Sequence, residues 1–428
     1  MRRTRVALIL AACTMVATGC GSAGGGKDTG SGPASGQITV WDYYGEATPL
    51  KKSIARFTKT HPDIKVKYQA FDYDTTHDKF AVATSSGDAP DLATVDMTWI
   101  PSFAANGLLS DLTPLSGGKL NGTGMKSQYT AGANEAMQYQ GKQVATLYDF
   151  DAYALYYRKD ILASKGIAVP KTWDDLVTAS NQMAERPSPG AKPTRYGLQV
   201  LPDTFHYSQL LFQNGGSILD ADGKKAAFNS DAGVEALDYM HGLIKDGGGL
   251  YWADPNNTVA GVKDQQIGMF VNGPYMMGQL KSGAPEQAGK WAVAPAPYNK
   301  QPGSYLGGTG LVVPTGAKNP RAAWELMQFL LKPAQQQLVY TEAGAAPATS
   351  AALELPALSK PDPYFGGQAP FGVFKDAMST ATHFPYVESW GDIDKSLTDA
   401  VTSVLLDKSS SKDALDKAAD TTDSKLGN

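Results

Sequence analysis

The chain contains little cysteine and little histidine. Its 428 residues include two cysteines, Cys13 and Cys20, and five histidines that are scattered along the sequence. Because Cys13 lies in an N-terminal segment that we expect to be removed, one cysteine remains, which cannot form an internal disulfide or a zinc–thiolate site. The scattered histidines argue against a metal site of their own. We therefore expect no metal and no cofactor.

Several catalytic and nucleic-acid-binding signals are also absent. The sequence contains no G-x-S-x-G, H-E-x-x-H or Walker motif, and no block of basic residues interrupts it. Its formal net charge of −4 is mildly acidic, whereas nucleic-acid-binding surfaces are basic. These absences argue against hydrolases and nucleotidases of those classes, and against a nucleic-acid partner.

The apolar run at the N-terminus is too short to be a membrane span. Residues 6–17 form a run of about a dozen residues, whereas a membrane-spanning helix needs ~20. Three arginines, Arg2, Arg3 and Arg5, precede this run. A basic region followed by a short apolar run is typical of a signal peptide, which we expect over residues 1–19.

Small residues lead to Cys20, and a polar segment follows it. The sequence Ala17-Thr18-Gly19-Cys20 resembles the bacterial lipobox, in which the cysteine becomes the lipid-modified first residue of the mature protein. Residues 21–36 contain no apolar residue larger than alanine, so we expect a flexible tether over residues 20–36. The protein would then be anchored by lipid on the outer face of the bacterial cell membrane. The alternative is an ordinary signal peptide and a soluble secreted protein.

The length of the remaining chain favours two domains, since single cores stop growing near ~250–300 residues. Residues 37–41 and 64–71 are predicted strands, with a helix over 49–60 between them and a further strand at 92–95. Strands and helices in this order predict an α/β fold with a parallel sheet. In such sheets ligands bind at the carboxyl ends of strands. The candidate binding residues at these ends are Tyr43, Tyr44, Glu46, Asp96, Thr98 and Trp99.

An acidic pair lies between two buried segments near the middle of the chain. Asp149 and Asp151 are two residues apart in a stretch rich in β-branched and aromatic residues. In an extended chain their carboxylates point to the same side, roughly 7 Å apart. We interpret this stretch as a crossing between two domains beside a polar site. The alternative is a loop in which aspartates serve as turn and cap residues.

A second and a third α/β block follow the crossing. Thr172 is a predicted helix N-cap, and Ser230 caps a helix with apolar residues at helical spacing. Residues 267–271 and 311–313 are predicted strands, and the tail from about residue 376 is mostly helical. Asn319 is a predicted cap with proline at the first helical position.

Six segments, in order, resemble the extracytoplasmic solute-binding proteins of carbohydrate ABC importers, of the maltose-binding type. The segments are ITVWDYYGE, APDLATVDMTWIPSFAANGLL, LYDFDAYALYYRKDIL, KTWDDL, IGMFVNGPY and LGGTGLVVPTGAKNPRAAWELMQFL. The resemblance implies two α/β lobes with a cleft between them, joined by crossing segments at residues 148–151, 305–310 and 342–347. Lobe 1 would comprise residues 37–148 and 308–344. Lobe 2 would comprise residues 149–307 and 345–428, including the C-terminal helices.

The resemblance also implies a ligand site that draws on both lobes. The first-lobe candidates above would be joined by Asp149, Asp151, Phe205, Tyr275, Gly308, Thr309 and Trp390. Carboxylates accept hydrogen bonds from sugar hydroxyls, and aromatic faces cover the C–H surface of a sugar ring. The family usually has tryptophan where this chain has Tyr275. Other aromatics are expected in the core, and we expect Trp173, Trp291 and Trp324 there.

The expected function is capture of a sugar or oligosaccharide and its delivery to a membrane permease by a monomeric, non-enzymatic protein. Two other functions stay open on the sequence. The first is a protein of the same fold that binds another solute, such as a polyamine, iron or a peptide; a cationic ligand would need a denser acidic cleft. The second is a glycoside hydrolase, because the spacing of Asp149 and Asp151 falls within the range that inverting enzymes use.

Overall fold

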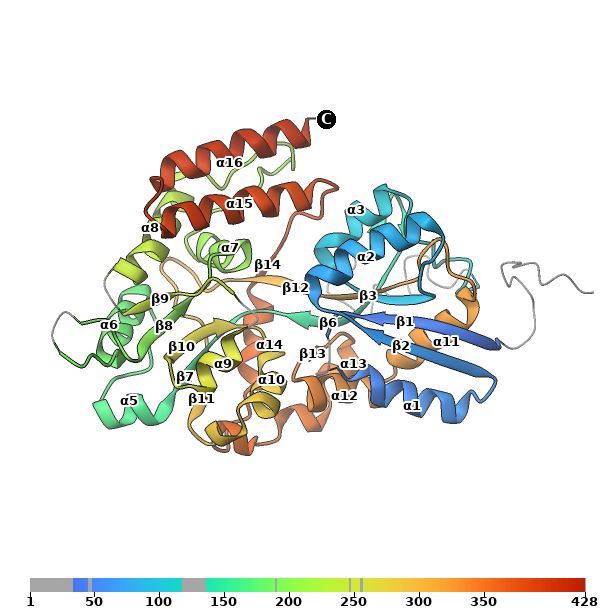
Figure 1. The fold of residues 1–428 in the computed structure, drawn as a ribbon, viewed down its shortest axis with the longest axis horizontal. Helices are drawn as coiled ribbons and strands as arrows, with labels where there is room; N and C mark the ends of the chain where they lie inside the picture. The colour runs from blue at the N-terminus through green and yellow to red at the C-terminus, as the bar shows by residue number, and fades with distance from the viewer. Residues whose placement is uncertain are drawn as a thin grey trace, which may run out of the picture.

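The computed structural model describes residues 34–44, 48–117, 136–188, 191–245, 248–254 and 257–427. The predicted signal peptide, Cys20 and Glu46 lie outside these ranges. The described chain forms two lobes, each built on its own β-sheet (Figure 1). Lobe 1 lies on the right of Figure 1 and lobe 2 on the left, and β6 and β12 run between them.

Lobe 1 is organised around a mixed sheet with the strand order β13-β6-β12-β3-β1-β2, and β14 pairs with the far end of β12. β1 pairs in parallel with β2 and β3, whereas β12 is antiparallel to both β3 and β6. The strands are β1 (Gly36–Asp42), β2 (Ile64–Ala70), β3 (Leu92–Asp96), β6 (Thr146–Asp151), β12 (Ser304–Val312), β13 (Ala346–Pro347) and β14 (Ala381–His383). A separate hairpin joins β4 (Gln138–Tyr139) and β5 (Lys142–Gln143).

The helices of lobe 1 follow the sequence pattern. α1 buries Leu50, Ile54 and Phe57, which recur at helical spacing. α11 begins at Pro320, and Asn319 caps it by accepting a hydrogen bond from the Ala322 amide. The helices associated with this lobe are α1 (Leu50–Thr60), α2 (Tyr73–Ser86), η2 (Met97–Trp99), α3 (Ile100–Ala105), α11 (Pro320–Leu330), α12 (Pro333–Ala343) and α13 (Ser350–Leu353).

Lobe 2 is organised around a sheet with the strand order β11-β7-β10-β8-β9. Its strands are β7 (Ala154–Arg158), β8 (Tyr196–Val200), β9 (Gly249–Tyr251), β10 (Ile267–Asn272) and β11 (Trp291–Ala294). Thr172 and Asp175 form a capping box at the start of α6. The helices are α5 (Lys159–Lys165), α6 (Trp173–Met183), α7 (Thr204–Gln213), α8 (Asp231–Lys245), α9 (Thr258–Lys263), α10 (Met276–Gly283), α14 (Phe371–Ser379), α15 (Trp390–Leu405) and α16 (Ser411–Leu426).

Two of the three predicted crossing segments lie in the strands β6 and β12 of the first sheet, and the third, 342–347, ends in the short strand β13. β12 spans nine residues, so its strand begins seven residues earlier than the sequence pattern at 311–313 indicated. It pairs with β6 as far as Asp151, and β13 pairs with β6 on the other side. The predicted lobe boundaries at residues 148/149 and 307/308 therefore fall inside β6 and β12. The physical reason is that backbone groups buried between lobes must be paired, and strand pairing supplies those hydrogen bonds.

The sheet of lobe 2 separates two hydrophobic cores. Tyr156 and Phe270 stack at 4.7 Å in the core that continues into lobe 1. Leu155, the neighbour of Tyr156, belongs to the second core, because successive side chains of a strand point to opposite faces. Helices α6 and α8 pack against the strands on that second face, and α15 and α16 form a further layer over α7 and α8 (Figure 1). The predicted core tryptophans Trp173, Trp291 and Trp324 are all buried.

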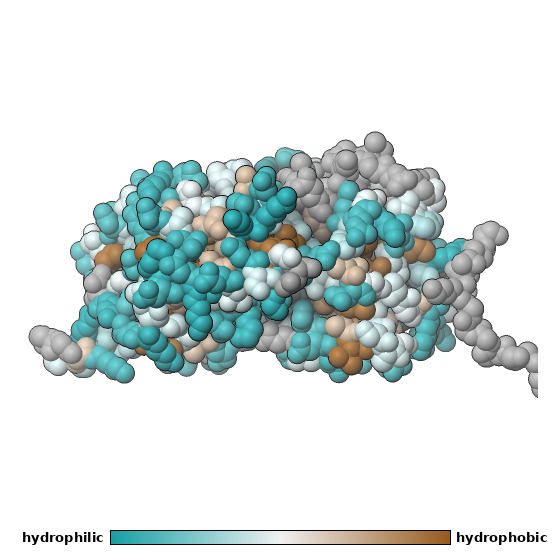
Figure 2. All heavy atoms as spheres, turned by 90° about the horizontal axis from the view of Figure 1, so that it is seen from above, coloured by the Kyte–Doolittle hydropathy of each residue, from teal (hydrophilic) through white to brown (hydrophobic). Residues whose placement is uncertain are grey.

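The surface is mainly polar. Figure 2 shows one face on which hydrophilic side chains predominate and hydrophobic ones are scattered in small groups. Within the described ranges, Val82 and Leu406 are the exposed large hydrophobic residues. In the part of the chain that the structure describes, no helix has both the length and the apolar character that crossing a membrane requires.

Candidate functional site

A threonine between two aspartates marks the polar centre of the first sheet. Thr309 on β12 lies opposite Asp96 on β3 and opposite Asp149 on β6, while Asp151 lies opposite Gly307. Residues opposite one another across neighbouring strands share a face of the sheet, and so do residues two apart on one strand. Asp96, Asp149 and Asp151 are therefore on one face, and we call them the acidic cluster.

A bulge in β6 lies directly beside Asp149. The pairing with β12 shifts between Thr309 and Gly310, so Tyr148 is an extra residue on the β6 side. Such bulges re-aim side chains and are frequent near functional sites. Here the bulge lets Asp149 face Thr309 while Leu147, on the other side of Tyr148, remains in the core.

Two tyrosines that follow β1 cover the acidic cluster. The Tyr44 hydroxyl donates a hydrogen bond of 2.8 Å to Asp149 Oδ2, and the Tyr43 and Thr309 hydroxyls share one of 2.6 Å. The two tyrosine rings stack with centroids 5.1 Å apart. Asp42, at the end of β1, accepts hydrogen bonds from Thr94 and Tyr68 and so fixes the strand end from which both rings project.

An aromatic wall continues from these tyrosines. The Trp99 ring lies 5.8 Å from Tyr43 and 4.5 Å from Tyr73, and His77 contacts Trp99 from the other side. The sequence pattern did not single out Tyr73 as a site residue, although it opens the helix that follows β2 and so lies at a strand end as well. Its position after Phe71 and Asp72 is the signal that would have found it.

Asp96 and Thr98 form hydrogen bonds with each other at the start of η2. Asp96 Oδ1 accepts hydrogen bonds from the Thr98 amide at 2.8 Å and from the Thr98 hydroxyl at 2.7 Å, which caps η2. Burial raises the pKa of Asp96, although these hydrogen bonds lower it. Thr98 is thus a partner of Asp96 in this arrangement, and its binding role stays a prediction.

Lobe 2 brings Tyr275 against the acidic cluster. The loop after β10 places Gly273 so close that a Cβ atom there would lie 2.7 Å from the Tyr275 ring and 3.2 Å from Asp151 Oδ1. Tyr275 donates a hydrogen bond of 2.5 Å to Asn272. Burial and then the charge of Asp151 raise the pKa of Tyr275, and the charge of Asp96, in lobe 1, adds to this rise. The two lobes therefore meet at this cluster.

Burial is the main influence on the pKa values of Asp149 and Asp151. Burial, the largest cause, raises the pKa of Asp149 to about 7, although hydrogen bonds from Tyr44 and Thr309 lower it. Burial, and then the charges of Asp149 and Asp96, raise the pKa of Asp151 well above its usual range. Asp149 Oδ1 and Asp151 Oδ1 are buried and have no hydrogen-bond partner.

Two predicted site residues lie elsewhere. Trp390 is 2% exposed and packs against Phe384 in the core of lobe 2, so the structure does not bring it to the acidic cluster. Phe205 is partly buried and contacts Tyr305 and Phe384. Tyr305, which sequence reasoning named only as the start of a crossing, lies between the two places: its ring contacts Phe205, and burial and then the charge of Asp151 raise its pKa.

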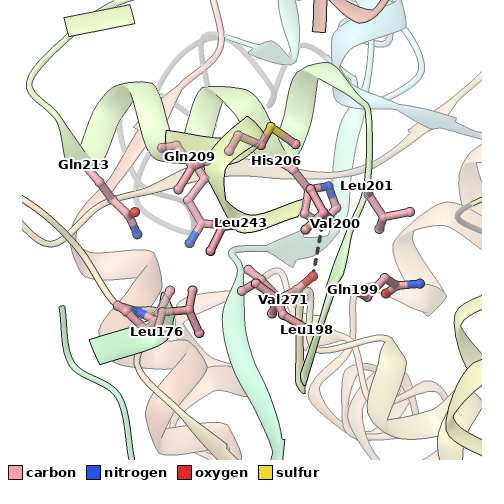
Figure 3. A pocket seen from close by; sticks show the side chains of 14 residues that line it. Leu176, Leu198, Gln199, Val200, Leu201, His206, Gln209, Gln213, Leu243 and Val271 are labelled. Carbon is pink, nitrogen blue, oxygen red and sulfur yellow. Dashed lines mark hydrogen bonds between the residues drawn. The ribbon is translucent and has the colours of Figure 1, made fainter. Parts of the chain in front are cut away.

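A small cavity in lobe 2 is separate from the acidic cluster (Figure 3). It has a volume of about 50 Å³ and lies between α6, α7, α8 and the sheet. Leucine and valine side chains form half of its lining, and His206 borders it while its ring forms a hydrogen bond with the Val271 carbonyl oxygen. None of the predicted site residues lines it. Within the described chain, no group of histidine, cysteine, aspartate and glutamate residues could hold a metal ion.

Comparison with known proteins decides the family. Residues 42–337 match the family described as bacterial extracellular solute-binding protein. The chain belongs to this family. The match includes Tyr43 and the whole acidic cluster, so the site described above lies in the part of this solute-binding protein that defines the family.

Two named relatives and one solved structure align with most of this solute-binding protein. It is 23% identical to the galactooligosaccharide-binding protein of Bacillus subtilis (strain 168), over 98% of this chain and 96% of the relative. It is 26% identical to the diacetylchitobiose binding protein of Streptomyces coelicolor, over 77% and 78%. The structure of the GacH receptor of Streptomyces glaucescens, solved unliganded and with acarbose, matches with a TM-score of 0.82 and 26% identity, over 92% of this chain and 100% of that one. The predicted two-lobed architecture of the maltose-binding type is thereby confirmed.

Proposed function

We propose that this solute-binding protein captures a sugar or oligosaccharide between its lobes and delivers it to the permease of an ABC importer. One observation carries the proposal: hydrogen-bonding groups and aromatic rings from both lobes meet at one place. Asp149, Asp151 and Thr309 supply polar atoms, and Tyr43 and Tyr275 supply rings. The proteins named above, described as binding galactooligosaccharide, diacetylchitobiose and acarbose, support the same class of ligand.

The chemistry of this place suits a sugar. Buried carboxylate and hydroxyl oxygens can accept hydrogen bonds from hydroxyl groups at a ring edge. Flat rings on either side can cover the C–H faces. Gly308 is a proposed contributor on the sequence resemblance, although its missing side chain makes room for the Asp149 carbonyl oxygen of the neighbouring strand. Glu46 stays a proposed contributor on the sequence resemblance alone.

We also propose that the protein acts outside the cell as a lipid-anchored monomer. The support is the lipobox-like sequence before Cys20 and the tether that follows it. Mass spectrometry of the membrane fraction should find a diacylglyceryl-modified Cys20 as the first residue, and Cys20→Ala should prevent this processing. An unmodified N-terminus at another residue would show an ordinary secreted protein instead.

The protein should bind its sugar without turning it over. The family is one of binding proteins, although Asp149 and Asp151 have the residue type and spacing that a glycosidase uses. Incubation with the tightest-binding oligosaccharide should return it intact by chromatography. Steady release of product that Asp149→Asn abolishes would instead identify a hydrolase.

The decisive experiment is a ligand screen on residues 34–428. Mono- and oligosaccharides are tested by thermal shift, and positive ligands are measured by calorimetry. A ligand at 100 times its Kd stabilises the folded state by about 2.7 kcal/mol, which a melting curve detects. A screen in which peptides or metal ions bind and no sugar does would reject the proposed ligand class.

A further inference from the structure

The acidic cluster has no cationic side chain to balance it. Across the described ranges, no lysine or arginine forms an ion pair with Asp96, Asp149 or Asp151. Burial raises the pKa of Asp96, and the opposing influence of His77, which contacts Trp99, does not offset it. The acidic cluster therefore has three carboxyl groups rather than two, because β3 adds Asp96 to the pair on β6.

Two carboxyl oxygens of the acidic cluster are buried and accept no hydrogen bond. Asp149 is 0% exposed; its Oδ2 accepts the Tyr44 hydroxyl, and its Oδ1 has no partner. Asp151 Oδ1 has no partner either and faces the loop at Gly273. Burying a charge costs much free energy unless the charge is paired. These oxygens are held in place by the sheet and by Tyr44, and are open to a donor that arrives with the solute.

The neighbouring groups do not satisfy this need. Thr309 and Tyr44 are neutral donors, and Tyr275 gives its hydrogen to Asn272. Beside the neutral hydroxyl groups of a plain sugar these carboxyls stay protonated, because burial raises the pKa of Asp149 and of Asp151. A protonated amine would favour their ionised forms, since it donates hydrogen bonds to a carboxylate and balances its charge.

We propose that the solute is an amino sugar, or an oligosaccharide containing one, whose protonated amine binds between Asp149 Oδ1 and Asp151 Oδ1. This inference rests on the proposed sugar-binding function and names the ligand class more narrowly. The adjacent rings favour the same charge, because an aromatic face attracts a cation that lies over it. The sugar ring, rather than a bare polyamine, accounts for the stacked Tyr43 and Tyr44 and for the ring of Tyr275 near Asp151.

Calorimetry with matched ligands tests the inference. The probes are glucose with glucosamine, galactose with galactosamine, and cellobiose with its diamino analogue chitobiose and its N-acetylated form, diacetylchitobiose, together with spermidine. The amine-bearing member of at least one pair should bind about tenfold to a hundredfold more tightly than its hydroxyl or acetamide counterpart, as expected for a charge-assisted hydrogen bond. The tightest ligand of the panel should carry a free amine.

Each other outcome rejects the inference. Neutral sugars that bind as tightly as their amines would overturn it and leave sugar binding intact, with the carboxyls protonated in the complex. Spermidine as the tightest ligand would replace the amino sugar by a polyamine. Absence of binding by every sugar of the panel would contradict both this inference and the proposed function.

Substitutions locate the amine. Asp151→Asn keeps the size of the side chain and removes its charge, so it should reduce the preference for amine over hydroxyl at least tenfold, while a neutral sugar loses less affinity. Asp399→Asn is the matched control, because Asp399 is an exposed partner of Lys395 on α15 and lies outside the cluster. Equal losses for the amine and the neutral ligand in Asp151→Asn would show a merely structural role and overturn the assignment.

Discussion

Single residues at the junction of the lobes combine two roles. Asp42 accepts hydrogen bonds that fix the end of β1, and Asp96 accepts hydrogen bonds that cap η2. Asp149 and Asp151 keep an unpartnered oxygen each. Side chains of one chemical type therefore divide into those that build the site and those that are available to a ligand, and the difference lies in their neighbours.

Asp149 should make the ligand-free protein less stable as pH rises. Its carboxyl has a pKa of 3.8 in the unfolded chain, and burial raises the pKa to about 7 in the folded one. Between these values the folded state holds a proton that the unfolded state has released, so the free energy of unfolding falls as pH rises from about 4 to about 7. The fall is on the order of 1–4 kcal/mol.

Asp149→Asn should remove the part of the pH dependence that Asp149 contributes, because asparagine does not ionise and still accepts the Tyr44 hydrogen bond, while Asp151, whose pKa burial also raises, keeps its own part. Chemical unfolding of both proteins at pH 5, 6, 7 and 8 measures it, with Asp399→Asn as the exposed control. The variant should gain stability relative to the wild type as pH rises. Parallel curves for wild type and Asp149→Asn would show that this carboxyl does not titrate in that range.

Tyr275 should contribute to binding through its ring. Tyr275→Ala removes a flat face beside Asp151 and should weaken sugar binding by about 1–3 kcal/mol, the worth of burying an aromatic ring. Tyr298→Ala, a partly buried tyrosine of the same lobe outside the site, is the control for general effects on folding. Calorimetry with the tightest-binding ligand of the screen measures the affinity of both variants. Equal affinities would show that Tyr275 is not part of the site.

At the scale of elements, the pairing of β6 with β12 determines where the polar groups lie. Gly308 has φ of +149°, and a Cβ atom there would approach the Asp149 carbonyl oxygen to 2.2 Å. Only glycine accommodates both the backbone conformation and this close approach. The strand that joins the lobes therefore depends on a residue without a side chain.

Gly308→Ala should destabilise the protein strongly or prevent folding, because the two strands must separate at Asp149. Gly242→Ala in α8 is the matched control, since a Cβ there meets nothing within 4 Å. It should stabilise the helix by roughly 0.5–1 kcal/mol. Melting temperatures give the comparison, and a Gly308→Ala protein as stable as the wild type would contradict this account of the strand pairing.

At the scale of the molecule, the lobes touch beyond the site. The Tyr139 hydroxyl of the β4–β5 hairpin donates a hydrogen bond of 2.6 Å to Glu388, which precedes α15. α15 also lies against η2 and α3 of lobe 1. A ligand that contacts both lobes favours the arrangement in which they are close, and only this difference in affinity can shift the equilibrium between arrangements.

Ligand binding should therefore make the protein more compact, and Tyr139→Phe should weaken binding by removing a bond that the closed arrangement makes. Small-angle scattering with and without the ligand measures the first effect, and calorimetry measures the second. The variant should remain folded, because phenylalanine keeps the partly buried ring and only an exposed hydrogen bond to Glu388 is lost. An unchanged radius of gyration on binding would show that the lobes are already fixed.

The sequence by itself determined the elements and the family. Helical spacing located α1, a cap with proline located α11, and β-branched and aromatic residues located β1 and β10, because these patterns are local and act within a few residues. Six segments in order indicated the two-lobed fold. The alternation along β6 also placed Asp149 and Asp151 on one side of the chain.

Tertiary structure decided which residues meet. Trp390 was expected at the site and lies in the core against Phe384, because an aromatic at a helix start serves packing or binding according to what faces it. Tyr73 joined the aromatic wall although 26 residues separate it from Trp99, and Asp96 came beside Asp149 through Thr309 although 53 residues separate the two aspartates. Such meetings depend on strand order and register, and these long-range pairings leave no local pattern in the sequence from which they could be inferred.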